Sequence, residues 1–311
     1  MKKYISPVLL SIGIVIIASS IWSFTLKNKV VEKVIIESKN ESSTNNPFKD
    51  YWYAGKAEIK TYKLTQSRYG ELHQGMATTI FVTEPFLKKE GVKPNQPNKN
   101  QVPVLKMNLL KKFGTGIYPY SMMLSTFTPI KETQGVIKAS ASGQEWCGQI
   151  FSQMNQRQGK YDVVSYSYFE QEGDTQFSLP TVFTEDEIWS RIRINYKKLP
   201  LGTFDIIPGL YYTRLEQHKF GVEKATASLK TNKKNTTYTI KYPKRNRTLA
   251  ITFTTSFPHE IVKWQESYAD KRAPEKMLTT TAVLDKSKNI AYWNYSAEKY
   301  KSIRKELNVP Y

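Results

Sequence analysis

The chain has 311 residues, a formal net charge of +19 at pH 7 and a single cysteine. One cysteine excludes an intramolecular disulfide, so a folded domain must be held together by its core, for which the 13% aromatic content provides material. Such a positive charge is typical of nucleic-acid-binding proteins. The N-terminal segment nevertheless predicts export, so anionic lipids and acidic glycans are the expected counterparts instead of nucleic acid. The alternative is a solvated basic surface with no specific ligand, because Lys and Arg are spread through the chain.

The first predicted element is an apolar N-terminal segment, residues 1–26. No charged residue occurs from Tyr4 to Leu26, and about 20 apolar helical residues suffice to cross a bilayer. We predict a retained signal anchor, with a cleaved signal peptide as the alternative. The anchor is favoured because the run exceeds the usual 7 to 15 residues of a signal peptide, and because Trp22 and Phe24 lie where interfacial aromatics are expected.

Residues 27–49 are predicted to be a polar linker, because the stretch ESKNESSTNNPFKD is too polar to bury a core. Residues 50–311 then form a β-rich soluble domain, with a subdivision near 200–209 as an alternative to one continuous unit. We expect this domain to lie in the periplasm, either anchored to the inner membrane or secreted.

Alternating apolar and polar residues dominate the chain after residue 50. Residues 237–242 alternate, and so do residues 248–253 after the turn PKRNR, which predicts an antiparallel hairpin. The same pattern predicts strands at 57–64, 76–83, 102–113, 118–127, 136–141, 161–169, 222–229, 261–268 and 278–284. The fold class is therefore mainly β, an antiparallel meander forming a sandwich or a curled half-barrel with a few covering helices. This pattern argues against parallel βαβ topology.

Two helices are predicted after the N-terminal segment. The first has Thr184 as N-cap, Glu187 as the capping-box partner and Phe183 as a hydrophobic staple. The second covers residues 296–307, where hydrophobic residues recur at spacings of three and four. We expect this second helix to cover an open edge or face of the sheet.

Polar and aromatic residues in three segments are candidates for ligand binding. The segment FGTGIYPYSMM would line a groove for an apolar or extended ligand, or alternatively its aromatics pack the sheet. Its glycines match neither a dinucleotide-binding site nor a P-loop, so no cofactor is predicted. The candidate residues are Arg68, Glu71 and His73 in QSRYGELHQG, Tyr118 and Tyr120, and Glu145, Trp146 and Cys147 in GQEWCGQ.

Catalysis by Cys147 would require a histidine partner. The chain has 3 histidines, none at a metal-ligand spacing such as HxxxH, so no metal site is predicted. Most lone cysteines behave as small buried hydrophobes, and no catalytic residue is identified. A hydrolase in which Cys147 or His73 acts with Glu71 or Glu145 remains an alternative.

Several segments resemble a family of Bacteroidota proteins labelled septum formation inhibitor Maf. These are YWYAGKAEI, RYGELH, TGIYPYSMM, SGQEWC and EDEIW, and the resemblance covers most of residues 50–310. It implies an uncharacterised envelope protein. Maf proteins in the strict sense are cytoplasmic α/β nucleotide pyrophosphatases with an S-x-S-P-R-R-like loop and metal-binding acidic residues. This chain shows none of these features, so no catalytic residue is transferred to it.

These observations together predict an envelope protein with a binding or scaffold role rather than an enzyme. Its expected partners are the membrane, through the N-terminal helix, and an anionic lipid, a glycan or another envelope protein. A nucleotide pyrophosphatase with a role in septum formation, as the family label suggests, is the alternative from another class.

Overall fold

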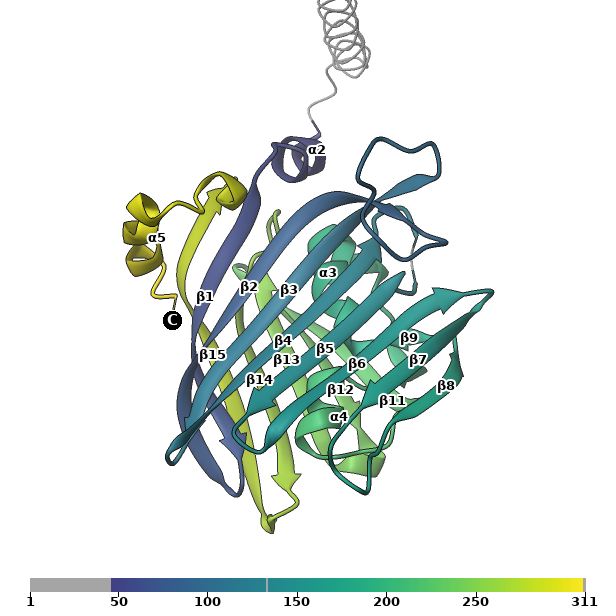
Figure 1. Ribbon diagram of the computed structural model, residues 1–311, viewed down its shortest axis with the longest axis vertical. Helices are drawn as coiled ribbons and strands as arrows, with labels where there is room; N and C mark the ends of the chain where they lie inside the picture. Colours follow the sequence, from purple (N-terminus) through teal and green to yellow (C-terminus); the bar gives the residue numbers. More distant parts are fainter. Residues whose placement is uncertain (1–45, 133, 310–311) are drawn as a thin grey trace, which may run out of the picture. The chain divides into compact units, whose positions relative to one another are not determined.

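The computed structural model describes residues 46–132 and 134–309 (Figure 1). Pro47–Tyr311 form one compact unit, separate from Met1–Asn46. The predicted anchor and nearly all of the predicted linker lie outside the described residues. Among the residues that are described, no helix has both the length and the apolar character needed to span a bilayer.

The unit is mainly β and contains one 15-stranded sheet. The first eight strands are β1 (Ala57–Arg68), β2 (Glu71–Leu87), β3 (Gln101–Thr115), β4 (Tyr118–Pro129), β5 (Lys138–Glu145), β6 (Gly148–Arg157), β7 (Lys160–Tyr166) and β8 (Thr175–Pro180). The others are β9 (Phe183–Thr184), β10 (Gly202–Ile207), β11 (Glu223–Thr231), β12 (Asn235–Tyr242), β13 (Arg247–Thr254), β14 (Ile261–Asp270) and β15 (Ala273–Ile290). The helices are α2 (Pro47–Trp52), α3 (Glu185–Asn195), α4 (Leu210–Leu215) and α5 (Lys301–Glu306).

The sheet is built from two runs of hairpins that meet at the first and last strands. The order along the sheet is β8-β7-β6-β5-β4-β3-β2-β1-β15-β14-β13-β12-β11-β10-β9. β1 pairs with β15, with Ala57 opposite Ile290, so the two halves of the chain form one continuous sheet. The segment 200–209 contains β10, which lies within this same sheet.

One strand pair departs from the antiparallel pattern. β9 and β10 run parallel, and α3 connects them, which makes a short βαβ unit. The prediction against parallel βαβ topology is therefore wrong at this position. β9 has only two residues, Phe183 and Thr184, too few for an alternating pattern to reveal a strand.

Every strand predicted from alternation overlaps an observed strand, and the predicted hairpin is formed by β12 and β13. The sequence pattern missed β6, β8, β9 and β10. In β6 the residues between the buried Ile150 and Met154 include Ser152, which is itself buried. A polar residue on the inner face weakens the alternation on which the prediction relies.

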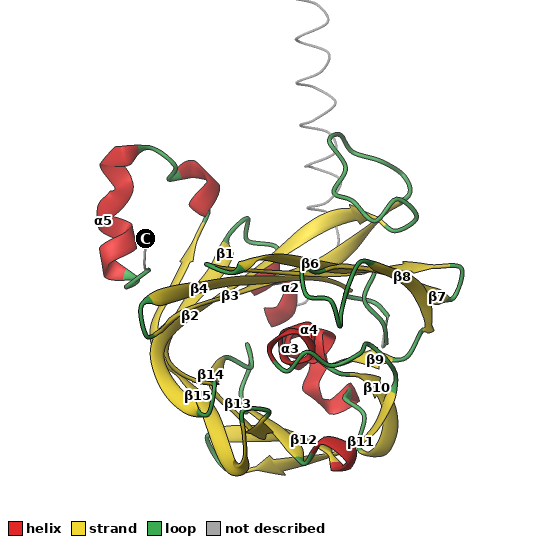
Figure 2. Cartoon of the chain, turned by 60° about the horizontal axis from the view of Figure 1, so that its bottom comes forward, coloured by secondary structure: helices red, strands yellow, loops and turns green. Residues whose placement is uncertain are grey.

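The sheet curls around α3 and α4, which lie on its inner side (Figure 2). α3 buries Ile188, Trp189 and Ile192, and the ring of Trp189 packs edge-on against that of Trp264 at 5.2 Å. In α4 the hydroxyl of Tyr211 donates to the carbonyl of Leu109 on β3. The core of the unit thus lies between the curled sheet and these two enclosed helices.

The predicted capping box at the start of α3 is confirmed. Thr184 Oγ1 accepts from the backbone N–H of Glu187 at 3.2 Å, and Glu187 Oε1 accepts from the backbone N–H of Thr184 at 3.0 Å. Glu187 Oε2 also accepts from Arg191 Nε at 2.8 Å. The side chain that caps the helix therefore also anchors an arginine one turn later.

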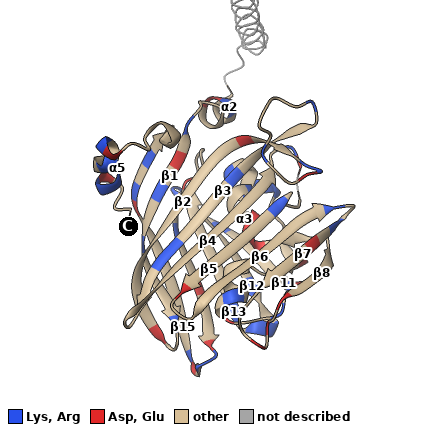
Figure 3. Ribbon diagram, viewed as in Figure 1, with Lys and Arg blue, Asp and Glu red and all other residues tan. Residues whose placement is uncertain are grey.

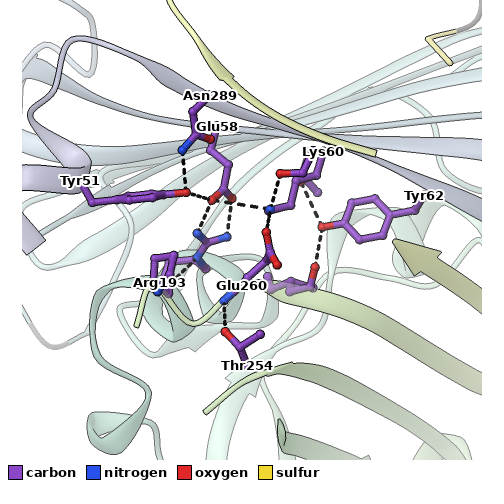
Figure 4. A network of polar contacts seen from close by, with 12 residues as sticks. Tyr51, Glu58, Lys60, Tyr62, Arg193, Thr254, Glu260 and Asn289 are labelled. Atoms are coloured by element: carbon purple, nitrogen blue, oxygen red, sulfur yellow. Dashed lines mark hydrogen bonds and ion pairs between the residues drawn. The ribbon is translucent and has the colours of Figure 1, made fainter. Parts of the chain in front are cut away.

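Buried ion pairs fasten α3 to the sheet (Figure 4). Arg193 donates to both carboxylate oxygens of Glu58 on β1, at 2.6 Å to Oε2. Burial favours the neutral acid, but Arg193 outweighs it, so the pKa of Glu58 is lowered. The neighbouring Lys60 pairs with Glu260 and donates to Ser287 Oγ at 2.8 Å. A buried charge is tolerated only with such partners.

A second buried ion-pair cluster joins the other end of α3 to β13 and β14. Arg247 donates to Glu185 through both Nη1, at 2.6 Å, and Nη2, at 2.7 Å. Its Nε donates to Glu266 at 2.8 Å. Tyr242 adds a hydrogen bond to Glu185 at 2.7 Å. Both ends of α3 are thus held by charge-assisted hydrogen bonds inside the curl.

The second predicted helix is shorter than expected. Only Lys301–Glu306 is α-helical, preceded by a 3-10 turn at Glu298–Tyr300. Figure 2 shows α5 outside the curl. The ion pair between Lys288 and Glu306 places it against the last third of β15, beyond the part of that strand that pairs with β14. It is tied there by polar contacts, such as Asn308 Nδ2 to Asp285 Oδ2 at 2.6 Å.

Candidate functional site

The hairpin turns alternate between two ends of the curled sheet. One end, which we call the cleft end, carries the turns β1–β2, β3–β4, β5–β6 and β14–β15, the β7–β8 loop of residues 167–174, and α4 with the segment after it. These segments are far apart in the sequence. The antiparallel register brings them together because each successive hairpin returns the chain to the same end.

A cleft of about 440 Å³ lies at this end. Its lining residues are Arg68, Tyr69, Tyr118, Glu145, Cys147, Phe169, Glu170, Gln171, Leu215, Glu216, Gln217, Asp270, Lys271 and Arg272. Four of the residues chosen from the sequence, Arg68, Tyr118, Glu145 and Cys147, are therefore in one cleft although they come from three different hairpins.

The remaining sequence candidates lie around this cleft. The buried Tyr120 hydrogen-bonds through its hydroxyl to that of the cleft residue Tyr69, at 2.6 Å. The ring of Trp146 lies 6.1 Å from that of Tyr118. His73 Nε2 lies 3.0 Å from the backbone oxygen of Arg68, and the exposed Glu71 is not among the lining residues.

The base of the cleft is an arginine–tyrosine stack. The guanidinium carbons of Arg68 and Arg272 lie 4.2 Å and 3.8 Å from the ring centre of Tyr69. Arg68 also donates to the backbone oxygen of Leu215, which fixes its position. Burial favours the neutral phenol of Tyr69, but hydrogen bonds from Tyr118 and Tyr120 and the nearby Arg68 outweigh burial and lower its pKa. The two guanidinium groups and the tyrosine hydroxyl thus give the base of the cleft positive charge and hydrogen-bonding groups.

The mouth of the cleft holds a fixed carboxylate beside exposed aromatic rings. Glu145 accepts from the backbone N–H of Cys147 and from the hydroxyl of Tyr168, both at 2.7 Å. Partial burial opposes ionisation, but these hydrogen bonds prevail and the pKa of Glu145 is lowered. Trp146 is 68% exposed next to it. Both an oriented acceptor and an open aromatic face are therefore available to a ligand.

The inner wall of the cleft carries two buried acids that sequence reasoning did not select, Glu216 and Asp270. Burial, together with the charge of Asp270, raises the pKa of Glu216 to about 7. Tyr69 and Arg272 were also missed. The signal available for Tyr69 is its place in the turn RYG, where it adopts a φ of 57°, unusual for a residue other than glycine. The sequence around Glu216 and Asp270 has no pattern that marks them as binding residues, because only folding places them in the cleft.

A second cavity of about 410 Å³ adjoins the cleft and shares Gln171 and Gln217 with it. Its apolar lining residues include Phe177 and Phe220. His218 also lines it, and burial together with the charge of Arg245 lowers the pKa of His218 to about 4. That imidazole is therefore neutral at pH 7.

The chemistry of Cys147 follows from its neighbour Glu145. The thiol is exposed, and its hydrogen bond to Glu145 raises its pKa, which favours the protonated, weakly nucleophilic form. No histidine is among the residues that line the cleft. In the part of the chain that the structure describes, no group of three or more His, Cys, Asp or Glu residues is arranged to hold a metal ion.

Comparisons with protein-family models, with curated proteins and with solved structures find no match to this chain.

Proposed function

We propose that this is a non-enzymatic envelope protein, held at the inner membrane by residues 1–26, whose periplasmic domain binds a glycan in the cleft. In this proposal the curled sheet is a scaffold that presents hairpin turns at one end. The observation that carries it is the mouth of the cleft, where the exposed Trp146 and the ring of Tyr118 stand beside the fixed carboxylate of Glu145.

A sugar ring fits this combination of groups. It has an apolar C–H face that packs on an aromatic ring and a rim of hydroxyls that donate to carboxylates. Glu145 is oriented before any ligand arrives, and Gln171 and Gln217 add amide groups to the lining of the cleft. Binding sites in general combine apolar walls with a few convergent polar groups of this kind.

The geometry gives less support to the Cys/His hydrolase. The pKa of Cys147 is raised by Glu145, whereas a nucleophilic thiol needs a lowered pKa and a base within hydrogen-bond reach. We therefore assign Cys147 a place in the wall of the binding cleft. A Cys147→Ala variant should bind the ligand about as well as the wild type.

The proposal is tested by isothermal titration calorimetry of residues 46–311 with chito-oligosaccharides and with muramidase-released peptidoglycan fragments. We expect saturable binding that falls about tenfold in Trp146→Ala, equivalent to about 1.4 kcal/mol. Ile117→Ala is the matched control, because Ile117 is an 83% exposed hydrophobic residue at another turn of the same end. No heat with any glycan, or equal losses in both variants, would exclude glycan binding at this mouth.

A further inference from the structure

The end of the sheet opposite the cleft is where the chain enters the domain. α2 precedes β1 at this end, and Tyr51 accepts from Asn289 Nδ2 at 3.1 Å, which joins α2 to the last residues of β15. The β2–β3, β4–β5, β11–β12 and β13–β14 turns, the segment 196–201 after α3 and the residues after β15 lie at this end too. We call it the tether end.

The tether end is rich in exposed basic residues. They include Lys49, Lys56, Lys89, Lys93, Lys99, Lys131, Lys197, Lys198, Lys233, Lys234, Lys299, Lys301 and Lys305. The exposed acids there are fewer, namely Asp50, Glu90, Glu298 and Glu306. Figure 3 shows Lys and Arg together with an acidic residue on α5. This end therefore complements an anionic surface.

Exposed amphipathic aromatics accompany these charges. Tyr53 after α2 is 52% exposed, and Trp293 and Tyr295 between β15 and α5 are 49% and 41% exposed. Tyrosine and tryptophan are the residues enriched at membrane–water interfaces, where the ring enters the headgroup layer and the polar atom stays hydrated. Lysines beside them would meet lipid phosphates.

The chain connection limits how far this end can be from a bilayer. Residues 27–46 separate the predicted anchor from α2. Twenty residues reach at most about 70 Å when fully extended. The effective concentration of lipid at the tether end is consequently high, and weak contacts suffice for docking.

We propose that the tether end is a docking surface for an anionic phospholipid bilayer, seated through Trp293, Tyr295 and the lysines of α5. The cleft end then faces away from the lipid, toward the glycan that it is proposed to bind. This docking does not depend on the identity of the cleft ligand.

The test is sedimentation of residues 46–311 with large unilamellar vesicles. This fragment contains the compact unit Pro47–Tyr311 with its own core. Vesicles of phosphatidylcholine with about 30% phosphatidylglycerol are compared with pure phosphatidylcholine, because basic side chains near an anionic surface gain about 1 kcal/mol each. We expect at least fivefold more bound protein on the anionic vesicles, with a decrease as salt is raised.

Two triple variants with the same change in charge test which surface binds the vesicles. Lys299→Glu/Lys301→Glu/Lys305→Glu should lower binding at least fivefold. Lys241→Glu/Lys244→Glu/Lys276→Glu changes three exposed lysines at or near the cleft end and should lower it less than twofold. Circular dichroism confirms that each variant is folded.

Equal losses in the two variants would show a nonspecific charge effect and overturn the proposal, as would equal binding to both vesicle types. Loss of vesicle binding in a Trp146→Ala/Ile117→Ala variant, with none in Trp293→Ala/Tyr295→Ala, would place the lipid at the cleft end and contradict it as well.

Discussion

At the residue scale, the most exacting requirement of this fold is the pairing of charges inside the curl. Arg193 and Glu58 are each almost wholly buried, and each is the main charged partner of the other. A buried ion pair contributes little net stability compared with apolar residues, but removing one partner leaves an uncompensated charge.

Arg193→Ala should therefore lower the free energy of unfolding by about 3 to 5 kcal/mol, measured by urea denaturation. In Arg193→Ala the carboxylate of Glu58 keeps only Lys60, with Nζ 3.8 Å from Oε2, as a charged partner. The double variant Arg193→Ala/Glu58→Gln, which also removes this poorly compensated charge, should be more stable than Arg193→Ala. Lys63→Ala is the control, since its side chain is 80% exposed and should change stability by less than about 0.5 kcal/mol. A double variant no more stable than the single one would refute the pairing argument.

The buried Asp186 is expected to make the stability of the protein depend on pH. Burial and the adjacent Glu185 raise the pKa of Asp186 to about 8, while its carboxylate still accepts from the backbone N–H of Leu210 at 3.1 Å. The unfolded chain releases this proton near pH 4. The folded state therefore holds more protons between about pH 4 and pH 8, and this residue's contribution makes stability fall as pH rises through that window.

Asp186→Asn keeps an acceptor for Leu210 and cannot ionise. Its stability relative to the wild type should therefore increase by a few kcal/mol from pH 4.5 to pH 8.5, measured by denaturation at each pH. The exposed Asp162→Asn serves as control. A constant difference between Asp186→Asn and wild type across this range would mean that Asp186 is ionised in the folded protein.

At the element scale, close contact between β2 and β3 depends on one glycine. A Cβ added to Gly75 would lie 2.4 Å from the carbonyl oxygen of Lys112 and 2.6 Å from Cβ of Phe113. Gly114, on the facing strand, has no heavy atom within 4 Å of the corresponding position. The two glycines are thus a matched pair in neighbouring residues of the same ladder.

Gly75→Ala should be destabilised by about 1 to 3 kcal/mol, because backbone must move to admit the methyl group. Gly114→Ala should stay within about 0.5 kcal/mol of the wild type. Thermal unfolding of the two variants measures both effects. Similar melting temperatures for the pair would show that β2 and β3 are not in the register described.

The same scale shows what sequence patterns can reveal. The hairpin of β12 and β13 and the start of α3 were predictable, because alternation and the capping box depend on near neighbours in the chain. The length of α5 was overestimated. Hydrophobic residues at spacings of three and four also occur in a segment that has little to pack against. β6 was missed because Ser152 lies among its inward-facing residues.

At the scale of the whole molecule, the sequence predicted a mainly β fold, but neither the pairing of β1 with β15 nor the enclosure of α3 could be foreseen. Both depend on contacts between residues more than 130 positions apart, such as Arg193 with Glu58. For the same reason, only a minority of the residues that line the cleft could be predicted from the sequence. Unusual sequence segments contain four of the lining residues, namely Arg68, Tyr118, Glu145 and Cys147. Glu216 and Asp270, in contrast, are brought to the cleft only by the fold.

The account of function depends on the claim that the cleft end is the binding surface. Hydrogen–deuterium exchange of residues 46–311, with and without muramidase-released peptidoglycan fragments, tests this claim most directly. We predict slower exchange on ligand addition at residues 118–120, 145–149, 167–172 and 214–218, with no change in α2 or α5. Protection confined to the tether end, or exchange that is unchanged throughout at saturating glycan, would contradict it.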